Sequence, residues 1–403
     1  MLAEEARATT HAAAHVLTQI LSTAAALQDG AMAAVLRTPA ARLPGMAASV
    51  GRTRQACARV YRAVELGTET VAVAGGEVWA QLTPAGSESV HSSRRGAGTT
   101  AALGAAIGDS LAAEPRTRAL LPELGIRQAG KPVTAADFVA DLPSGTPLCL
   151  FLHGLGCHEG HWDTSLLQAV VPAGYIPVMI RYNTGLPIDQ NGAALALLID
   201  ELDMAVAPQR WLLVGHSMGG LVARRALEHI AESEATTAGQ GAVLSRMTAL
   251  VTLGSPHSGS PVEKGAHLAL SGLARLPSTR PIAQFGHRRS MGIKDLRHGA
   301  LRPSDWGGRH PDEAIADRTD KRPLPGAVPH LAVVARWSDK RWLDPVVGDG
   351  IVREASARHG RGDLGGTAVL PDCSHLGLLS DQRVAELLSD ISEAGRPSTG
   401  RTV

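Results

Sequence analysis

The strongest constraint on the fold is a regular alternation of strand-like and helix-like segments after about residue 145. Short apolar runs rich in β-forming residues occur at Leu148–Leu152, Ile176–Ile180, Trp211–Val214, Ala249–Leu253, Leu331–Ala335 and Thr367–Leu370. Between and after them, apolar residues recur at helical spacing in Thr164–Val171, Gly192–Val206, Leu221–Ile230 and Asp381–Ile391. Strands that alternate with helices favour βαβ units. We therefore predict an α/β fold, with a mostly parallel sheet flanked by helices.

The first 140 residues have a different character. They are rich in alanine and show helical periodicity in Ala12–Leu27 and Cys57–Val64, with a Gly/Ser/Arg-rich break around Ser92–Thr99. Glycines and prolines in Arg127–Thr146 are typical of a linker. We expect a mainly helical N-terminal region over residues 1–140 and a catalytic domain over residues 141–403.

Composition excludes several classes of protein. The 403 residues carry 39 Lys and Arg against 38 Asp and Glu, a net charge of +1, which argues against a general nucleic-acid-binding surface. The four cysteines are too few for a disulfide-dense scaffold. No run of 18 apolar residues occurs, and the first residues include acid where a signal peptide carries base. We expect a cytoplasmic protein with no transmembrane segment.

A candidate nucleophile lies in the pentapeptide Gly215-His216-Ser217-Met218-Gly219, which has the form G-x-S-x-G. The pentapeptide alone also fits a glycine-rich turn with an incidental serine. However, it follows the apolar run WLLV and precedes the helical pattern LVARRALEHI. This strand–turn–helix context is the one in which a serine hydroxyl is exposed above a sheet for nucleophilic attack.

A nucleophilic serine also needs a base, an orienting acid and donors for an oxyanion. The turn His153-Gly154-Leu155-Gly156 follows the first strong strand, so we expect the backbone N–H groups of Leu155 and Met218 to form the oxyanion hole. Among the histidines after Ser217, only His375 follows the last strand run closely and precedes the final helix. Asp349, in a glycine-flanked turn after Leu331–Ala335, is the favoured acid, and Asp344 is the alternative.

Taken together, these segments resemble the α/β-hydrolase superfamily, in particular bacterial lipases and esterases. The similarity lies in His153–Gly156, the elbow Gly215–Arg224, the strand end Val251–Gly259, the acid turn Asp349–Val352 and the histidine turn Ser374–Leu376. Ser255 stands where threonine is more usual. Arg181–Gly185 and Ile293–Gly299 are similar to a branch related to lipases and GPI inositol deacylases. The resemblance implies ester hydrolysis through an acyl-enzyme, without metal or cofactor.

The resemblance leaves three segments to interpret. The long stretch of about residues 258–328 suits a cap or lid insertion over Ser217, with a solvated excursion of the chain as the alternative. Cys157-His158-Glu159-Gly160-His161 has its histidines three residues apart beside a glycine, unlike a zinc-protease helix, so we expect no metal there. We expect this segment to line the substrate pocket, with substrate-binding residues His153, Gly154, His158, Trp162 and His216. Cys157 and Cys373 both flank the site; we expect free thiols, with a disulfide as the alternative.

The sequence therefore predicts a serine carboxylic-ester hydrolase, an esterase or lipase, that acts on a small-molecule or lipid ester. Two alternatives stay open: an acyltransferase on the same fold, and a non-catalytic α/β-hydrolase-like binding protein. The N-terminal helical region, which the resemblance does not cover, is a candidate surface for a homo-oligomer.

Overall fold

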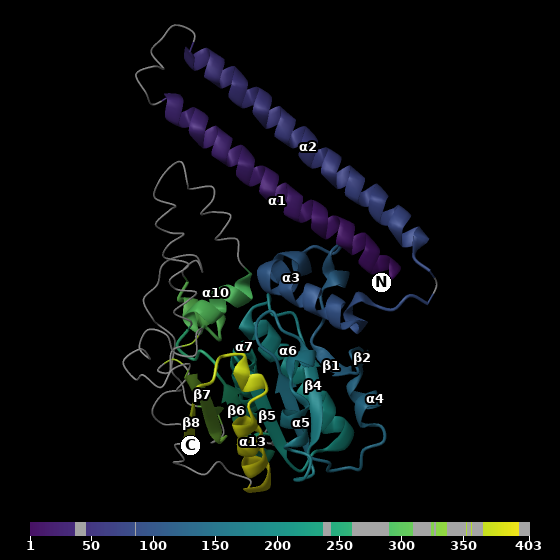
Figure 1. The fold of residues 1–403 in the computed structure, drawn as a ribbon, viewed down its shortest axis with the longest axis vertical. Coiled ribbons are helices and arrows are strands. Elements are labelled where there is room, and N and C mark those ends of the chain that lie inside the picture. The colour runs from purple at the N-terminus through teal and green to yellow at the C-terminus, as the bar shows by residue number, and fades with distance from the viewer. Residues whose placement is uncertain are drawn as a thin grey trace. The chain divides into compact units, whose positions relative to one another are not determined.

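A computed structural model of the chain describes residues 1–36, 46–84, 86–236, 243–259, 290–308, 324–325, 328–336, 352, 356 and 366–394. The described residues form two compact units (Figure 1). One comprises Met1–Val90 and Ser110–Leu121; the other comprises His91–Asp109 and the described residues from Pro122 onward. The second unit contains the whole β-sheet, and the candidate site belongs to it.

The sheet has eight strands in the described residues, in the order β2-β1-β4-β3-β5-β6-β7-β8. Their bounds are β1 Gly125–Gln128, β2 Lys131–Val133, β3 Leu148–Leu152, β4 Ile176–Arg181, β5 Trp211–His216, β6 Met247–Leu253, β7 His330–Arg336 and β8 Gly366–Pro371. Strands β3 to β8 run parallel, and β1 and β2 add an antiparallel hairpin at one edge. The chain passes from β3 to β4 on one side and then to β5 on the other. Ligands bind at such a switch point, beyond the carboxyl ends of the strands.

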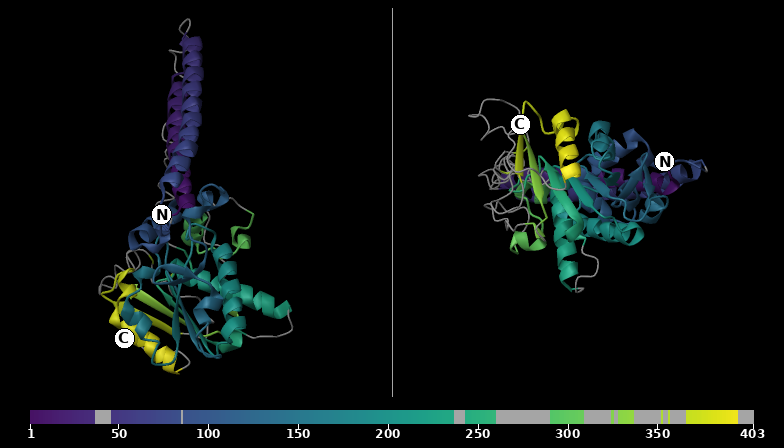
Figure 2. Two further views of the ribbon diagram at one scale, coloured as in Figure 1. Left: turned by 90° about the vertical axis from the view of Figure 1, so that its right-hand side faces the viewer. Right: turned by 90° about the horizontal axis from the view of Figure 1, so that it is seen from below.

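The helices of this unit are α4 Ala135–Val139, α5 Thr164–Gln168, α6 Ile188–Val206, α7 Met218–Thr236, α10 Met291–His298 and α13 Gln382–Ala394, together with the part of α3, Arg94–Ala113, that ends at Asp109. Helices α4, α6 and α7 pack on one face of the sheet, and α5 and α13 pack on the other (Figure 2). Short 3₁₀ turns, among them η4 Glu159–His161 and η6 Pro303–Trp306, connect the elements. The alternation of strand and helix predicted from the sequence is confirmed.

The core follows the alternation of side chains along each strand. Leu148, Leu150 and Leu152 of β3 pack with α6 and α7, whereas Cys149 and Phe151 pack with α5 and α13. Each such aliphatic or aromatic side chain contributes about 1.5–3 kcal/mol when fully buried. Burial on both faces explains why these strands read as continuous apolar runs.

The other unit is built on a helical hairpin. Helix α1, Ala3–Leu36, lies antiparallel to α2, Met46–Leu82, and the turn η3, Arg118–Leu120, packs on α1. The buried Glu5 carboxylate accepts the amide of Val90 at 2.8 Å and the hydroxyl of Ser89. No helix among the described residues has the length and apolarity to cross a bilayer.

The sheet unit begins earlier than the boundary expected at residue 140. The expected linker over Arg127–Thr146 contains most of the β1–β2 hairpin, and Ile126 of β1 pairs with Ile180 of β4. The break expected at Ser92–Thr99 instead contains the start of α3. Glycine and proline in Gly125–Val133 weaken the strand signal, and the glycines of α3 weaken its helix signal, because both depend on tertiary contacts.

Candidate active site

Ser217 lies at the sharp turn between β5 and α7 and has a left-handed backbone, with φ of +53°. Such a conformation costs a serine roughly 1–3 kcal/mol, so the surroundings must hold it. The Ser217 amide donates to the carbonyl of Leu253 at the end of β6, at 2.8 Å. The turn is thus anchored to the neighbouring strand, as the nucleophile-elbow prediction requires.

The glycines of the elbow are needed for close packing. A Cβ on Gly219 would lie 2.3 Å from the carbonyl oxygen of Leu152, and one on Gly220 would lie 2.1 Å from Ser255 Oγ. A Cβ on Gly215 would lie 2.4 Å from the Gly220 amide. Helix α7 therefore starts directly against the ends of β3 and β6.

The turn after β3 faces the serine. A Cβ on Gly154 would be 3.0 Å from Ser217 Cβ, so Gly154 borders the hydroxyl-bearing carbon. The amide of Gly156 donates to Thr184 Oγ1 at 3.2 Å, and that of Cys157 donates to the Gly154 carbonyl at 3.1 Å. In the described part of the chain, the intervening Leu155 amide donates to no acceptor. Met218 begins α7, so its N–H has no acceptor within the helix.

His375 is buried on the loop that follows β8, beside the elbow. His216 Nε2 donates to the backbone carbonyl of His375 at 3.0 Å, and the two rings lie 4.8 Å apart. The Cys373 amide donates to the carbonyl of Arg336 at the end of β7, at 3.1 Å, and this bond holds the loop against the sheet. Among the described residues no hydrogen bond joins Ser217 Oγ to His375.

The favoured acid, Asp349, and the alternative, Asp344, both lie outside the described residues. Val352, three positions after Asp349, is buried against Val334 of β7 and Val369 of β8. Most of the cap or lid expected over residues 258–328 also lies outside the described residues. The acid therefore stays a prediction.

The predicted substrate-binding side chains are held in the protein interior. The His153 ring stacks on Tyr182 at 4.5 Å, and burial lowers the pKa of His153 to about 4. Burial, with the neighbouring His375 next in effect, lowers the pKa of His216 to about 3. Both rings are therefore neutral near pH 7. Their contact with substrate stays a prediction.

His158 and Trp162 also have partners within the protein. His158 Nδ1 accepts the amide of Gly160 at 3.1 Å and so caps η4. The Trp162 ring meets Phe151 edge-on at 5.2 Å. Cys157 is a free thiol, so it does not pair with Cys373. No group of three or more potential metal ligands occurs among the described residues.

A buried ion pair supports this side of the site. Arg181, at the end of β4, binds both carboxylate oxygens of Glu159, and its Nη1 donates to the His91 carbonyl at 2.6 Å. Burial raises the pKa of Glu159, but the hydrogen bonds and charge of Arg181 outweigh it and hold that pKa below its ordinary value. Burial also lowers the pKa of Arg127 to about 10, and the neighbouring Arg181 adds to this effect.

The sequence pointed to the loop Asn183–Gly185 only through its family resemblance and gave no sign that this loop holds the expected oxyanion turn. A Cβ on Gly185 would lie 2.1 Å from the Gly104 carbonyl of α3, and one on Gly292 would lie 2.0 Å from the Thr184 carbonyl. The loop is thus clamped between α3 and α10, and it directs the Thr184 hydroxyl to the Gly156 amide. The sequence around Thr184 does not indicate that its hydroxyl accepts the amide of Gly156, because the two residues are 28 positions apart.

The sequence profile described as "Alpha/beta hydrolase family" matches residues 149–387, more than half of the chain. The chain therefore belongs to the alpha/beta hydrolase family, as its motifs and fold predicted. No curated protein matches the sequence closely enough to count as a relative.

Several solved structures of lipases and esterases are similar to the chain. The mature form of Bacillus licheniformis lipase BlEst2 shares 19% identity over 59% of this chain and 89% of its own, with a TM-score of 0.38. The propeptide form of the same lipase also shares 19% identity, over 65% of this chain and 54% of its own, with a TM-score of 0.45. The esterase EaEST from Exiguobacterium antarcticum shares 16% identity, over 62% of this chain and 93% of its own, with a TM-score of 0.37.

Proposed function

We propose that this protein is a serine carboxylic-ester hydrolase. The observation that carries the proposal is the left-handed Ser217 at the β5–α7 turn, whose neighbour His216 is hydrogen-bonded to the backbone of His375. A strained serine at the carboxyl edge of a parallel sheet, beside a histidine loop and a glycine turn, has the arrangement that acyl transfer needs.

In the proposed mechanism, Ser217 Oγ attacks the acyl carbonyl while His375 takes its proton. The N–H groups of Leu155 and Met218 bind the oxyanion, and each such donor contributes about 2.7–4 kcal/mol to lowering the barrier. His375 then gives the proton to the leaving alcohol. Water, activated by His375, hydrolyses the acyl-enzyme and releases the acid. Asp349 orients His375 and stabilises its imidazolium form.

The proposed substrate is a small-molecule or lipid ester, with water as the acyl acceptor. Both esterase and lipase activity fit this proposal, as does the GPI inositol-deacylase-like branch suggested by the sequence. A cytoplasmic location and a homo-oligomer through the N-terminal helices are likewise proposals.

Hydrolysis of p-nitrophenyl butyrate and palmitate tests the function and the preferred acyl length together. We expect the full chain to release p-nitrophenol, and Ser217→Ala to lower kcat by at least roughly 10³-fold. Ser233→Ala removes an exposed serine farther along the same helix and serves as the matched control. Its activity should equal that of the wild type.

Three outcomes would contradict the proposal. Undiminished hydrolysis by Ser217→Ala would assign the nucleophile elsewhere. Inactivity of the wild-type chain on a broad ester panel would favour the binding protein. Faster transfer of the acyl group to an added alcohol than to water would indicate an acyltransferase.

A further inference from the structure

Helix α10 packs against the loop that holds the expected oxyanion turn, but the proposed mechanism gives this helix no role. Its start is fastened to α3 by backbone hydrogen bonds. The Ser290 amide donates to the Ala106 carbonyl at 3.0 Å, and the Met291 amide donates to Asp109 Oδ2 at 2.9 Å. Because α3 belongs to the sheet unit up to Asp109, α10 has a fixed support there.

One face of α10 holds the loop that runs from Asn183 to the start of α6. The Gly292 amide donates to the Gly185 carbonyl at 3.0 Å. One turn later, Asp295 Oδ2 accepts the Ile188 amide, the first of α6, at 2.9 Å. Gly292 and Asp295 are three positions apart, so they lie on the same face of the helix. Helix α10 therefore holds both the middle of the loop and its junction with α6.

Asp295 is a buried acid whose two carboxylate oxygens each accept an N–H group. It is 4% exposed, and Oδ1 accepts Trp306 Nε1 at 3.1 Å. Burial raises the pKa of Asp295 to about 7, and the carboxylates of Asp189 and Asp305 add to this rise. The hydrogen bonds from Ile188 and Trp306 oppose it. At about pH 8.5 the carboxyl group is mainly ionised, and an ionised acceptor forms the stronger hydrogen bonds.

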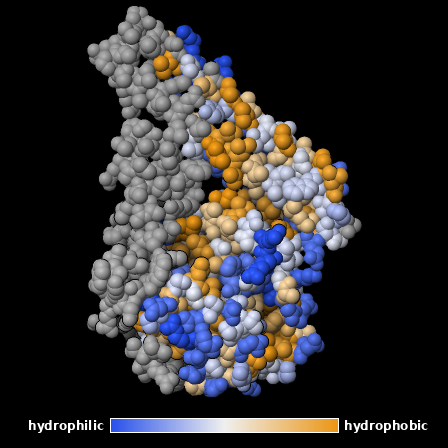
Figure 3. Space-filling view, viewed as in Figure 1, coloured by the Kyte–Doolittle hydropathy of each residue, from blue (hydrophilic) through white to orange (hydrophobic). Residues whose placement is uncertain are grey.

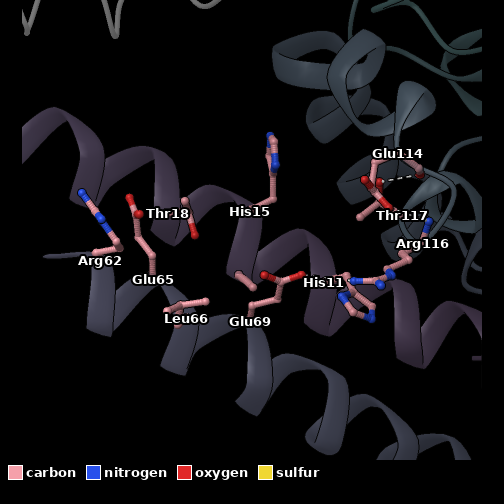
Figure 4. Close-up of a pocket in the computed structure, with 11 residues that line it drawn as sticks. His11, His15, Thr18, Arg62, Glu65, Leu66, Glu69, Glu114, Arg116 and Thr117 are labelled. Atoms are coloured by element: carbon pink, nitrogen blue, oxygen red, sulfur yellow. Dashed lines mark hydrogen bonds and ion pairs between the residues drawn. The ribbon is translucent and has the colours of Figure 1, made fainter. Parts of the chain in front are cut away.

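This burial separates Asp295 from the ion-paired groups of the helical hairpin, which are exposed. The hairpin surface carries hydrophobic residues between its charged ones (Figure 3). Arg116 and Glu69 line a pocket of about 440 Å³ there and form an ion pair at 3.2 Å, with side chains 56% and 63% exposed (Figure 4). Water competes for such exposed pairs, so they contribute little. Water does not compete in the same way for the hydrogen bonds of Asp295, and a donor left unpaired there is costly.

We propose that Asp295 is a positioning residue for the proposed ester hydrolysis. By holding the Ile188 amide, its carboxylate fixes the end of the loop whose Thr184 hydroxyl accepts the Gly156 amide. The expected oxyanion turn is thereby held where its N–H groups meet the transition state. The carboxylate acts through the loop and not on the substrate. This role rests on the proposed function, because the turn binds an oxyanion only if the protein transfers acyl groups.

Hydrolysis of p-nitrophenyl butyrate at about pH 8.5 tests the role. Asp295→Asn keeps the size of the side chain but turns an NH₂ group toward one of its two N–H donors. We expect kcat to fall roughly 10-fold with KM changed less than about twofold, because the turn loses its placement. The matched control Asp203→Asn changes an acid near the other end of α6, which binds Arg246 at 2.8 Å. Its kcat should equal that of the wild type.

A double-variant cycle separates positioning from a general structural effect. In a Thr184→Val background, Asp295→Asn should lower kcat less than about twofold, because the bond that transmits its effect is already lost. Independent, multiplying effects of the two substitutions would overturn the proposal. So would an unchanged kcat in Asp295→Asn, or a raised KM at unchanged kcat.

Amide hydrogen exchange, read by mass spectrometry without substrate, tests the same role independently of activity. Peptides containing Gly156 and Ile188 should exchange roughly 10-fold faster in Asp295→Asn than in the wild type or Asp203→Asn, whereas β3 should not change. Asp295→Ala, which removes both acceptors without adding a donor, should show the same pattern. Unchanged exchange at Gly156, or faster exchange throughout the sheet, would overturn the proposal. A wild type inactive on esters would overturn the proposed function, and hydrogen exchange would still show whether Asp295 holds the turn.

Discussion

At the scale of single residues, the site depends on how neighbours hold strained or unpaired groups. The left-handed Ser217 is kept in place by its amide bond to Leu253 and by glycines that admit the ends of β3 and β6. The G-x-S-x-G pattern predicted this turn because glycine spacing reflects a steric need. Asn183 and Thr184 gave no such signal, since their roles depend on partners far away in the sequence.

Thr184 offers a test of how the oxyanion turn is positioned. Thr184→Val keeps the shape of the side chain but leaves the Gly156 amide without its acceptor. We expect kcat for ester hydrolysis to fall roughly 10-fold with little change in KM, because donors that bind the transition state lose their placement. Thr184→Ser, which retains the hydroxyl, should restore kcat. Equal kcat values for the valine variant and the wild type would contradict this role.

The buried neutral histidines make stability depend on pH in one direction. The pKa of His153 is lowered to about 4, so between about pH 6.5 and 4 the unfolded chain binds a proton there and the folded chain does not. The free energy of unfolding should therefore decrease as the pH falls through this window. Each such histidine contributes at most about 1.4 kcal/mol per pH unit.

Urea unfolding at a series of pH values measures this effect. His153→Gln removes the titrating ring, so the decrease in unfolding free energy between pH 6.5 and 4 should be shallower than in the wild type. The Gln variant is also expected to be less stable at pH 7, because it loses the stacking on Tyr182. An identical pH slope in the two proteins would show that His153 does not supply this dependence.

At the scale of elements, the parallel strands were predictable to within two residues because each is buried on both faces and reads as an apolar run. The β1–β2 hairpin and α3 were not predicted. The two strands of the hairpin are short and partly polar, and α3 is rich in glycine. The hairpin is fixed by the pairing of β1 with β4, and α3 is fixed by its packing on Asn183–Gly185. Tertiary contacts override weak local preference in both cases.

Substitutions at two glycines of α3 can distinguish the effect of tertiary packing from the effect of helix propensity. A Cβ on Gly108 would lie 2.2 Å from Asn183 Oδ1, whereas nothing would lie within 4 Å of one on Gly98. We expect Gly108→Ala to destabilise the protein by about 1–3 kcal/mol, because the loop must shift. Gly98→Ala should stabilise it by about 0.5–1 kcal/mol. Chemical denaturation of the two variants measures both values, and equal effects would argue against the clamp on Asn183–Gly185.

At the scale of the whole molecule, the fold class and the family could be predicted from the order of motifs along the chain. The elbow, the expected oxyanion turn and the predicted histidine turn all follow parallel strands, so the topology brings their backbones to the carboxyl edge of the sheet. The division of the chain was harder to predict. Residues 91–109 contribute α3 to the sheet unit, although they lie within the helical N-terminal region.

The central claim is that Ser217 carries the acyl group during turnover. The direct measurement is mass spectrometry of the peptide containing Ser217 after acid quenching of the reaction with p-nitrophenyl acetate. We predict an acetyl group on Ser217 in the wild type and none on that peptide in Ser217→Ala. Steady hydrolysis with the acetyl group on another residue, or on no residue of the chain, would contradict the mechanism.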